Sequence, residues 1–202
     1  SLKTQTLKPN RVIVVDNAST DDSINGLGEE FGNFEIIKLE ENTGFSFANN
    51  LAVKKVDDCD WIAFLNPDAF ACPDWLEKLS KAAEEFPGCA SFGSHMLRYG
   101  SDRMDGTGDV YHVCGSAWRR DHNALSSKVK REIQEIFSPC AAASFIRRDV
   151  FSEAGGFDEN FFAYFEDVDL GFRLQLKGYA CRYVPDAVVK HVGSATTSCK
   201  SD

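Results

Sequence analysis

Residues 61–68 read Trp-Ile-Ala-Phe-Leu-Asn-Pro-Asp: five apolar residues, then an amide, a proline and a carboxylate. A short, continuous apolar run of this kind predicts a strand buried on both faces, as the strands of parallel sheets are. Residues 12–16, Val-Ile-Val-Val-Asp, show the same pattern earlier in the chain, and a carboxylate again follows the apolar run. Both predicted strands therefore end beside a polar side chain that could bind a ligand.

Segments with helical spacing alternate with the apolar runs. Strands are expected at Val12–Val15, Ile36–Leu39, Trp61–Leu65, Ala141–Ile146 and Tyr179–Val184, and helices from Ser23 to about Phe31, over 45–56, from Pro73 to Pro87, at Arg148–Ala154 and at Glu166–Leu176. This alternation indicates an α/β fold with a mostly parallel central sheet flanked by helices. Between Gly93 and Ser138 the periodicity is lost, and a long irregular segment with one helix near Lys128–Ile136 is expected there.

The composition restricts the class of protein. The chain has 202 residues, 43% of them hydrophobic, which suits one domain over residues 1–202 and excludes a wholly disordered chain. Lys and Arg number 22 against 31 Asp and Glu, and the net charge of −9 argues against a nucleic-acid partner. Anionic ligands remain compatible with this charge, because a metal ion supplies positive charge locally.

The number and spacing of the cysteines and the length of the apolar runs indicate where the protein is located. The seven cysteines are an odd number with no C-x-x-C pair, which fits reduced thiols in a cytosolic protein better than a disulfide framework. No apolar run approaches the roughly 20 residues that cross a bilayer, and the N-terminus carries no signal-peptide core. A cytoplasmic location is therefore expected.

Asp16 and Asp68 follow the two apolar strands described above. In an open α/β sheet, ligands bind beyond the carboxyl ends of the parallel strands, so both carboxylates are expected at the functional edge. Carboxylates suit hard divalent cations, which commonly bridge to phosphate groups. The alternative is structural: Asp16 caps the next helix and Asp68 stabilises a turn.

A third informative segment, residues 157–170, reads FDENFFAYFEDVDL and sets aromatic rings directly before an acidic helix start. The helix dipole stabilises acids in the first turn, so a structural role could explain one of them. Three acids beside so much apolar surface, Glu166, Asp167 and Asp169, point further, to a general base near a hydroxyl nucleophile. Asp169 is expected to pair with Arg173 four residues on and to be structural.

His191 follows the last predicted strand and is the fourth candidate. A single histidine is most often structural or simply exposed. It becomes a candidate imidazole ligand if the fold brings it to the same metal ion as Asp68. The three other histidines, His95, His112 and His122, have no such context and receive no role.

Six short segments stand in order along the chain. They are Val12–Asp21 (VIVVDNASTD), Glu41–Phe45 (ENTGF), Phe64–Asp68 (FLNPD), Gly155–Asp158 (GGFD), Glu166–Leu170 with Arg173, and Val184–Ala187 with His191. In order and spacing they resemble the motifs of family 2 glycosyltransferases with the GT-A fold, a Rossmann-like fold. The match is to the bacterial branch that includes rhamnosyl- and galactofuranosyl-transferases. The resemblance spans nearly the whole chain and is loosest from Gly93 to Ser138.

The resemblance implies an inverting transfer of a sugar from a UDP- or dTDP-linked donor to a hydroxyl of a saccharide or lipid-linked saccharide. Such a transfer belongs to cell-surface polysaccharide synthesis. The implied nucleotide-sugar-binding residues are Asp16, Asn17, Asn42, Gly44, Asn66 and Trp118, the last beside Arg119 in a loop near the donor. By the same likeness, Asp68 and His191 hold Mg²⁺ or Mn²⁺ on the diphosphate. Asp167 is then the base, and Glu166 orients the acceptor.

The chain departs from the family pattern in three places. Asn66 replaces the first carboxylate of the D-x-D motif, and residues 141–143 are Ala-Ala-Ala where relatives tend to have Gly-Ala. The family also begins with a strand and a turn that contact the nucleotide, whereas Ser1–Leu7 resembles the end of the helix after that strand. A fragment with impaired donor binding, or a homo-oligomer that fills the gap, is therefore expected. The longer protein would lie at the inner face of the membrane.

Two other functions stay open on the sequence alone. A metal-dependent nucleotidyltransferase also combines an α/β sheet with carboxylate-bound Mg²⁺, but it would need a Gly-rich, basic phosphate loop early in the chain. No such loop is visible. The other alternative is a binding module that keeps the fold without the activity.

Overall fold

The computed structural model describes residues 1–25, 27 and 34–193. Its α-helices are α1 (Gly44–Val53), α2 (Trp75–Glu85), α3 (Arg148–Glu153) and α4 (Glu166–Leu176), and two short 3₁₀ helices lie at Leu2–Thr4 and Ser126–Lys128. Its strands are β1 (Val12–Asp16), β2 (Phe34–Lys38), β3 (Trp61–Leu65), β4 (Ala69–Ala71), β5 (Cys89–Arg98), β6 (Met104–Gly106), β7 (Asp109–Tyr111), β8 (Ala117–Arg119), β9 (Gln134–Ile136), β10 (Ala143–Arg147) and β11 (Ala180–His191).

The α/β class is confirmed, but the expectation of a mostly parallel sheet is wrong. The large sheet has the order β3-β10-β5-β11-β4, with β6 on β5 and β9 on β11, and its only parallel pair among the described residues is β5 with β11. Strand β10 runs antiparallel to both β3 and β5, so β3, β5 and β11 share one direction. Three strands thus point their carboxyl ends the same way in a mixed sheet.

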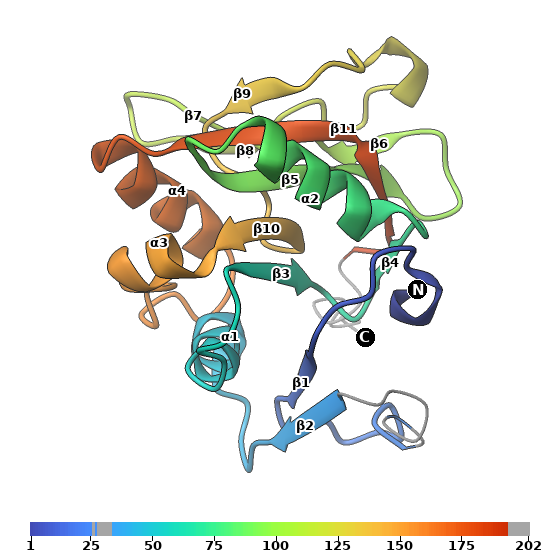
Figure 1. Ribbon diagram of the computed structural model, residues 1–202, viewed down its shortest axis with the longest axis vertical. Coiled ribbons are helices and arrows are strands. Elements are labelled where there is room, and N and C mark those ends of the chain that lie inside the picture. Colours follow the sequence, from blue (N-terminus) through green and yellow to red (C-terminus); the bar gives the residue numbers. More distant parts are fainter. Residues whose placement is uncertain (26, 28–33, 194–202) are drawn as a thin grey trace, which may run out of the picture.

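Helices cover the large sheet on two faces, and alternate strand residues serve the two cores. On β10, Phe145 belongs to the cluster that α2 covers, whereas its neighbour Ile146 belongs to the cluster beneath α1, α3 and α4. Figure 1 shows α2 lying across the sheet, with α1, α3 and α4 gathered beside one another at the left. Nearly fully buried apolar residues of the helices include Trp75 and Leu79 on α2, Val150 on α3 and Leu174 on α4.

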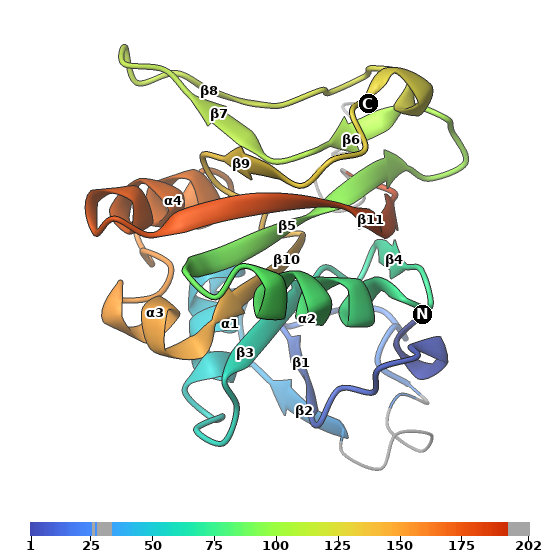
Figure 2. The same cartoon turned by 45° about the horizontal axis from the view of Figure 1, so that its top comes forward.

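The segment 93–138 is more regular than expected. It contains the end of β5, which is a central strand, and the hairpin of β7 and β8 that stands apart from the large sheet in Figure 2. The expected helix at Lys128–Ile136 is wrong, because a 3₁₀ turn and strand β9 occupy that region.

Strand β5 was missed because it buries polar residues instead of an apolar run. Its Ser91 and Ser94 are fully buried and donate hydrogen bonds to the carbonyl oxygens of Phe145 (3.1 Å) and Ala143 (2.8 Å) on β10. Ser94 also accepts the indole N–H of Trp75 at 2.8 Å. Burial of these hydroxyl groups costs little free energy because each is hydrogen-bonded. The carbonyl groups that accept these bonds belong to β10, so no pattern within the β5 sequence reveals them.

Strand β11 continues through Pro185, where the sequence predicted its end. Its register against β5 shifts between Val184 and Val188, so the proline sits in an irregularity of the ladder. A proline, which has no backbone N–H, is tolerated at such a bulge. His191 is consequently the last residue of a strand and not part of a following loop.

The N-terminal segment is fixed to the start of α2 by a buried glutamine. The side chain of Gln5, only 1% exposed, accepts the N–H of Leu76 at 3.0 Å and donates to the carbonyl oxygen of Cys72 at 2.8 Å. The N–H groups of a first helical turn have no partner within the helix, so Gln5 supplies one. Thr6 adds a backbone bond to Pro73 at 2.7 Å.

Strands β1 and β2 form a separate parallel pair. Within the described residues β1 pairs with β2 alone and β3 with β10 alone, so each has one edge without a ladder partner. The helix expected to reach Phe31 lies mostly outside the described residues, and its first residues, up to Asn25, form bends and turns. The cysteines in the described part are free, and no helix there is long and apolar enough to span a membrane.

Replacing Gln5 by alanine should lower the free energy of unfolding by about 1–3 kcal/mol, because the buried N–H of Leu76 loses its partner and the carbonyl of Cys72 keeps only the N–H of Trp75. Urea unfolding followed by circular dichroism measures this as a lower midpoint with an unchanged slope. Thr4→Ala is the control: its hydroxyl bonds only to the exposed carbonyl of Ser1, so a change within about 0.5 kcal/mol is expected. Equal midpoints for the two variants would contradict the anchoring role of Gln5.

Candidate active site

The carboxyl ends of β3 and β11 bring Asp68 and His191 together. Asp68 lies in the turn from β3 to β4, and His191 ends β11, where it pairs in register with Ala69 of β4. The Nε2 atom of His191 is 3.2 Å from Oδ1 of Asp68, and the N–H of Val192 donates to the backbone carbonyl of Asp68 at 3.0 Å. The predicted pairing of these two residues is therefore present in the structure.

Asn66, at the start of the same turn, is held by its backbone. Its N–H donates to the carbonyl oxygen of Ala142 at 2.9 Å, and its carbonyl accepts the N–H of Ala69 at 3.0 Å. These bonds place the turn between β3 and β4 beside the start of β10. Asn66 and Asp68 thus sit on a constrained turn at the sheet edge.

The other ring nitrogen of His191 contacts a residue that the sequence did not single out. Nδ1 of His191 is 2.9 Å from Oδ2 of Asp105, on the short strand β6. The hydrogen bond to Asp105 raises the pKa of His191 above its ordinary value, although burial opposes the shift, and the charge of Asp68 adds to it. Asp105 lies in the segment where the sequence pattern is lost, so only the fold reveals it.

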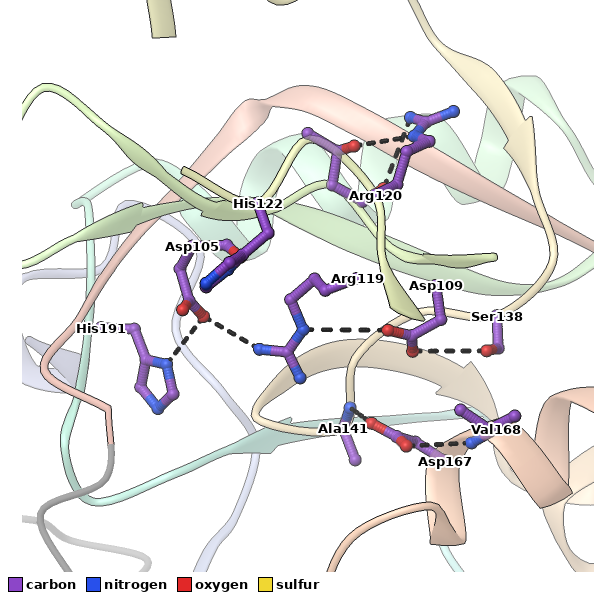
Figure 3. Close-up of polar contacts among 11 residues, drawn as sticks. Asp105, Asp109, Arg119, Arg120, His122, Ser138, Ala141, Asp167, Val168 and His191 are labelled. Carbon is purple, nitrogen blue, oxygen red and sulfur yellow. Dashed lines mark hydrogen bonds and ion pairs between the residues drawn. The ribbon is translucent and has the colours of Figure 1, made fainter. Parts of the chain in front are cut away.

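Arg119 links this group to a second carboxylate. Its guanidinium is 3.0 Å from Oδ2 of Asp105 and 3.8 Å from Oδ1 of Asp109, the first residue of β7. Figure 3 shows Arg119 between the two carboxylates, with His191 at one end of the group and Asp167 near the other. One cation therefore lies between the Asp68–His191 pair and the acidic start of α4, where it interacts with the charge of Asp167 without a direct ion pair.

Asp109 is almost fully buried, with 6% of its surface exposed. Burial, reinforced by the charge of Asp167, raises the pKa of Asp109 to about 7, although Arg119 opposes the shift. Its carboxylate is 3.4 Å from the hydroxyl of Ser138. A carboxyl group with this pKa is partly protonated at neutral pH.

Asp167 is held at the first turn of α4 by two backbone donors. Its Oδ2 accepts the N–H of Ala141 at 3.1 Å, and its Oδ1 accepts the N–H of Val168 at 2.9 Å. Figure 3 shows both bonds. Because the donors belong to two different elements, the carboxylate has a fixed orientation.

Glu166 precedes Asp167 and is 6% exposed. Among the described side chains its Oε2 is a buried oxygen without a hydrogen-bond partner. Burial first, and the charge of Asp167 second, raise the pKa of Glu166 to about 7. Strongly shifted carboxyl groups of this kind gather at functional sites.

The backbone before these acids is strained. Tyr164 and Phe165 both have φ values in the left-handed region, 69° and 68°, which side chains other than glycine rarely adopt. The rings of Phe162, Tyr164 and Phe165 are 58%, 61% and 53% exposed. An exposed aromatic surface therefore borders the carboxylates. The predicted pair of Asp169 with Arg173 is confirmed at 2.6 Å along the helix.

Asn17 and Asn42 form a hydrogen-bonded group with Thr43 and Gly44. Asn17 accepts the N–H of Thr43 at 2.8 Å and donates to Asn42 and to the carbonyl of Gly44, each at 3.0 Å. Gly44 has a φ of 83°, and a Cβ there would overlap the carbonyl oxygen of Phe162. Three of these residues, Asn17, Asn42 and Gly44, are predicted donor-binding residues, and the group adjoins Phe162 in the segment that leads to α4.

Asp16 ends β1, and its Oδ1 accepts the N–H of Ser19 at 2.9 Å. Hydrogen bonding by Ser19, through its side chain first and its backbone N–H second, lowers the pKa of Asp16 below its ordinary value. Asp16 therefore stabilises the turn after β1, and the helix that its structural alternative would cap lies mostly outside the described residues. Asp16 reaches the rest of the site through its neighbour Asn17. Asp68 and His191 are linked through Asp105 and Arg119 to Asp109, and Asp167 lies close enough to Asp109 to raise its pKa through its charge.

Trp118 lies on β8 opposite Val110 of β7, and half of its surface is exposed. Successive strand residues point to opposite faces. Its neighbour Arg119 is accordingly the residue that points into the charged group (Figure 3).

The donors of Asp68 and His191 fit a divalent cation that also binds a substrate. Within the described residues, no group of three or more His, Cys, Asp or Glu side chains could hold a metal ion by itself. Mg²⁺ commonly takes one or two carboxylates and completes its octahedron with phosphate oxygens and water. The 3.2 Å between the two donor atoms is close to the roughly 3 Å that separates adjacent ligands of such an ion.

Solved structures with similar architecture bind nucleotides. GalNAc-T7 with UDP, GalNAc and Mn²⁺ superposes with a TM-score of 0.70 at 15% identity, over 90% of this chain and 37% of that one. Staphylococcus aureus TarS 1–349 with UDP gives a TM-score of 0.64 at 17% identity, over 93% of this chain and 53% of that one. These likenesses establish the GT-A fold.

Curated relatives are similar along most of the chain. A Mycobacterium tuberculosis N-acetylglucosaminyl-diphospho-decaprenol L-rhamnosyltransferase is 29% identical, over 95% of this chain and 69% of the relative. The O-antigen chain rhamnosyltransferase RfbN of Salmonella typhimurium is 26% identical, over 95% of this chain and 60% of the relative. Rhamnosyltransferase WbbL of Escherichia coli is 32% identical, over 70% of this chain and 58% of the relative.

A protein-family model also matches most of the chain. The model for glycosyl transferase family 2 covers residues 1–155, which include the Asp16, Asn42 and Asp68 segments. With this match, and with rhamnosyltransferases among its sequence relatives, the chain belongs to glycosyl transferase family 2, in its rhamnosyltransferase-like branch.

Proposed function

We propose that this glycosyltransferase moves a sugar, with inversion at its anomeric carbon, from a nucleoside-diphosphate sugar to a hydroxyl of a lipid-linked saccharide. The observation that carries the proposal is the convergence of Asp68, His191 and Asp167 around Arg119, which pairs with Asp105 and Asp109 and lies close enough to interact with the charge of Asp167. A diphosphate-binding pair and a carboxylate base must lie near each other for such a transfer, and they come from distant parts of the chain.

On the donor side, Asp68 and His191 would hold Mg²⁺ or Mn²⁺ together with the diphosphate. The ion, when bound, neutralises the charge that develops on the leaving diphosphate. The carbonyl oxygen of the Asn66 side chain adds a neutral acceptor on the same turn. Asp16, with Asn17, Asn42 and Gly44, would line the nucleoside end, where Asp16 can accept an N–H of the base. Trp118, next to Arg119, would also contribute to the donor side.

On the acceptor side, Asp167 would remove the proton of the acceptor hydroxyl as that oxygen attacks C1 of the sugar. The bond from C1 to the diphosphate oxygen breaks as the new bond forms on the opposite face. The backbone donors of Ala141 and Val168 keep the Asp167 carboxylate aimed during this step. Proton removal by a positioned carboxylate accelerates such reactions by roughly 10²- to 10⁴-fold.

Glu166 would orient the acceptor. With a pKa of about 7 it carries a proton in part of the molecules at neutral pH, so it can donate a hydrogen bond to a sugar hydroxyl. The exposed rings of Phe162 and Tyr164 offer an apolar surface beside it. Aromatic rings of this kind suit the apolar faces of sugars and the lipid part of an acceptor.

The names of two relatives indicate a class of acceptor and a pathway. The mycobacterial relative is described as acting on N-acetylglucosaminyl-diphospho-decaprenol, and the Salmonella relative belongs to O-antigen synthesis. We extend these to a lipid-linked saccharide acceptor and to cell-surface polysaccharide synthesis at the inner, cytoplasmic face of the membrane. UDP accompanies both solved structures of similar fold, and dTDP remains the alternative carrier. Release of a nucleoside diphosphate, with no pyrophosphate, would separate this function from nucleotidyl transfer.

Asp167→Asn should lower turnover by roughly 10²- to 10⁴-fold and leave the dissociation constant for UDP nearly unchanged, because the amide keeps the shape but cannot take a proton. Turnover is measured as released nucleoside diphosphate and UDP binding by calorimetry. Asp169→Asn, the same change two residues on, is the matched control and should retain turnover. Unaltered turnover in the Asp167 variant would remove this residue as the base.

Asp68→Ala should weaken Mn²⁺-dependent binding of UDP by more than about 10-fold, because one of the two protein donors is lost. Calorimetric titration with and without Mn²⁺ measures the difference, and excess EDTA should reduce the wild-type affinity to that of the variant. Asp186→Ala removes an exposed carboxylate from the same strand as His191 and should bind like the wild type. Metal-independent UDP binding by the wild type would refute the assignment.

Glu166→Gln should flatten the pH dependence of stability. The folded chain keeps the Glu166 proton up to pH about 7, whereas the unfolded chain releases it near the ordinary value of 4.5, so raising the pH between these values destabilises the wild type. The glutamine variant lacks this loss and should gain roughly 1–3 kcal/mol relative to the wild type between pH 5 and pH 8. Urea unfolding at both pH values measures it, and parallel curves would be the contrary result.

A further inference from the structure

Asp105 is a buried carboxylate whose role neither the sequence motifs nor the family match assigns. It lies in the middle of β6, which pairs with β5 at Met96 and Leu97, and it is only 9% exposed. Its Oδ2 atom faces two partners, Nδ1 of His191 at 2.9 Å and the guanidinium of Arg119 at 3.0 Å. Figure 3 shows both contacts.

The two nitrogens of His191 face two different carboxylates. Nδ1 faces Asp105, and Nε2 faces Asp68 at 3.2 Å. A histidine that binds a metal through one nitrogen needs an acceptor for the proton on the other, and a carboxylate in that place fixes the ring and strengthens the bond to the metal. The arrangement leaves Nε2 as the nitrogen that points toward the donor side.

We propose that Asp105 is the positioning residue for His191: it fixes the imidazole so that Nε2 is presented, with Asp68, to the divalent cation. The inference rests on the proposed function, since it assumes that this pair holds the cation. Asp105 acts only through His191 and does not itself touch the metal or the diphosphate.

Arg119 completes the arrangement by fixing Asp105. Its side chain crosses β6 at Gly106, where a Cβ would overlap the Arg119 stem, so the small residue lets the guanidinium reach Asp105. The backbone carbonyl of Asp105 accepts a further hydrogen bond from Nδ1 of His122 at 2.8 Å. Asp105 is therefore held through its side chain and its backbone, as an orienting residue must be.

The test measures Mn²⁺ binding to the full chain in the presence of UDP, from the electron paramagnetic resonance signal of free Mn²⁺. Asp105→Ala should raise the dissociation constant for Mn²⁺ by about 10- to 100-fold, the loss typical of removing the partner of a ligating histidine. Asp105→Asn keeps an oxygen that accepts the Nδ1 proton and should recover most of the affinity. Asp102→Asn changes an exposed carboxylate in the turn before β6 and should match the wild type.

A second readout does not depend on affinity. In the Mg²⁺–UDP complex, ¹⁵N NMR of the imidazole should show a proton on Nδ1 of His191 and none on Nε2, with the signal identified by its loss in His191→Gln. In Asp105→Ala the Nδ1 proton should exchange with water too fast to be seen. Circular dichroism checks that each variant is folded. If Asp105→Ala is unfolded, the test uses the wild type and Asp105→Asn, and a slowly exchanging Nδ1 proton in both supports the proposal.

The outcomes separate the two proposals. If the wild type binds Mn²⁺ with UDP and folded Asp105→Ala binds it equally well, the positioning role is overturned and the proposed function stands. A fast-exchanging Nδ1 proton in the wild-type complex overturns it as well. If the wild type binds no Mn²⁺ in the presence of UDP, the metal-dependent donor site fails, and the role of Asp105 fails with it.

Discussion

The common direction of β3, β5 and β11 is the constraint on which the site depends. Strand β10, inserted antiparallel between β3 and β5, keeps the two on either side of it parallel, and β11 then pairs parallel with β5. Chain segments more than a hundred residues apart therefore end at one edge of the sheet. Asp68 and His191 meet there at 3.2 Å, although nothing in their local sequences relates one to the other.

Arg119 is the cation around which the carboxylates of this edge are arranged. It pairs with Asp105 and Asp109, and its charge lowers the pKa of both carboxyl groups, opposing the effect of their burial. Burial first, and the charge of Asp167 second, raise the pKa of Asp109 and of Glu166, and Arg119 only partly opposes both shifts. An acidic site with spare negative charge is suited to a cation that arrives with its substrate.

Much of the fold was predictable where a local pattern is strong. Strand β3 and helix α4 have the bounds that their apolar run and acidic start predict, and the pairing of Asp68 with His191 was implied by the family resemblance. Strand β5 was not predictable, because its buried serines are stable only through partners on β10. Asp105 was not predictable for a related reason. Its strand, β6, has only three residues, depends on pairing with β5 and leaves no periodic pattern in the sequence. The mixed sheet was missed because alternation alone does not reveal the direction of β10.

The left-handed backbone at Tyr164 and Phe165 has a consequence for how such an enzyme can change. Each of these residues costs the folded chain roughly 1–2 kcal/mol, and the surrounding contacts must supply that energy. Sequence changes that relax this segment would raise heat resistance while letting the start of α4 drift. Under the proposed function, variants selected for thermostability alone would therefore accumulate substitutions at Tyr164 and Phe165 that reduce activity. Variants selected for catalysis would keep both residues in the left-handed conformation.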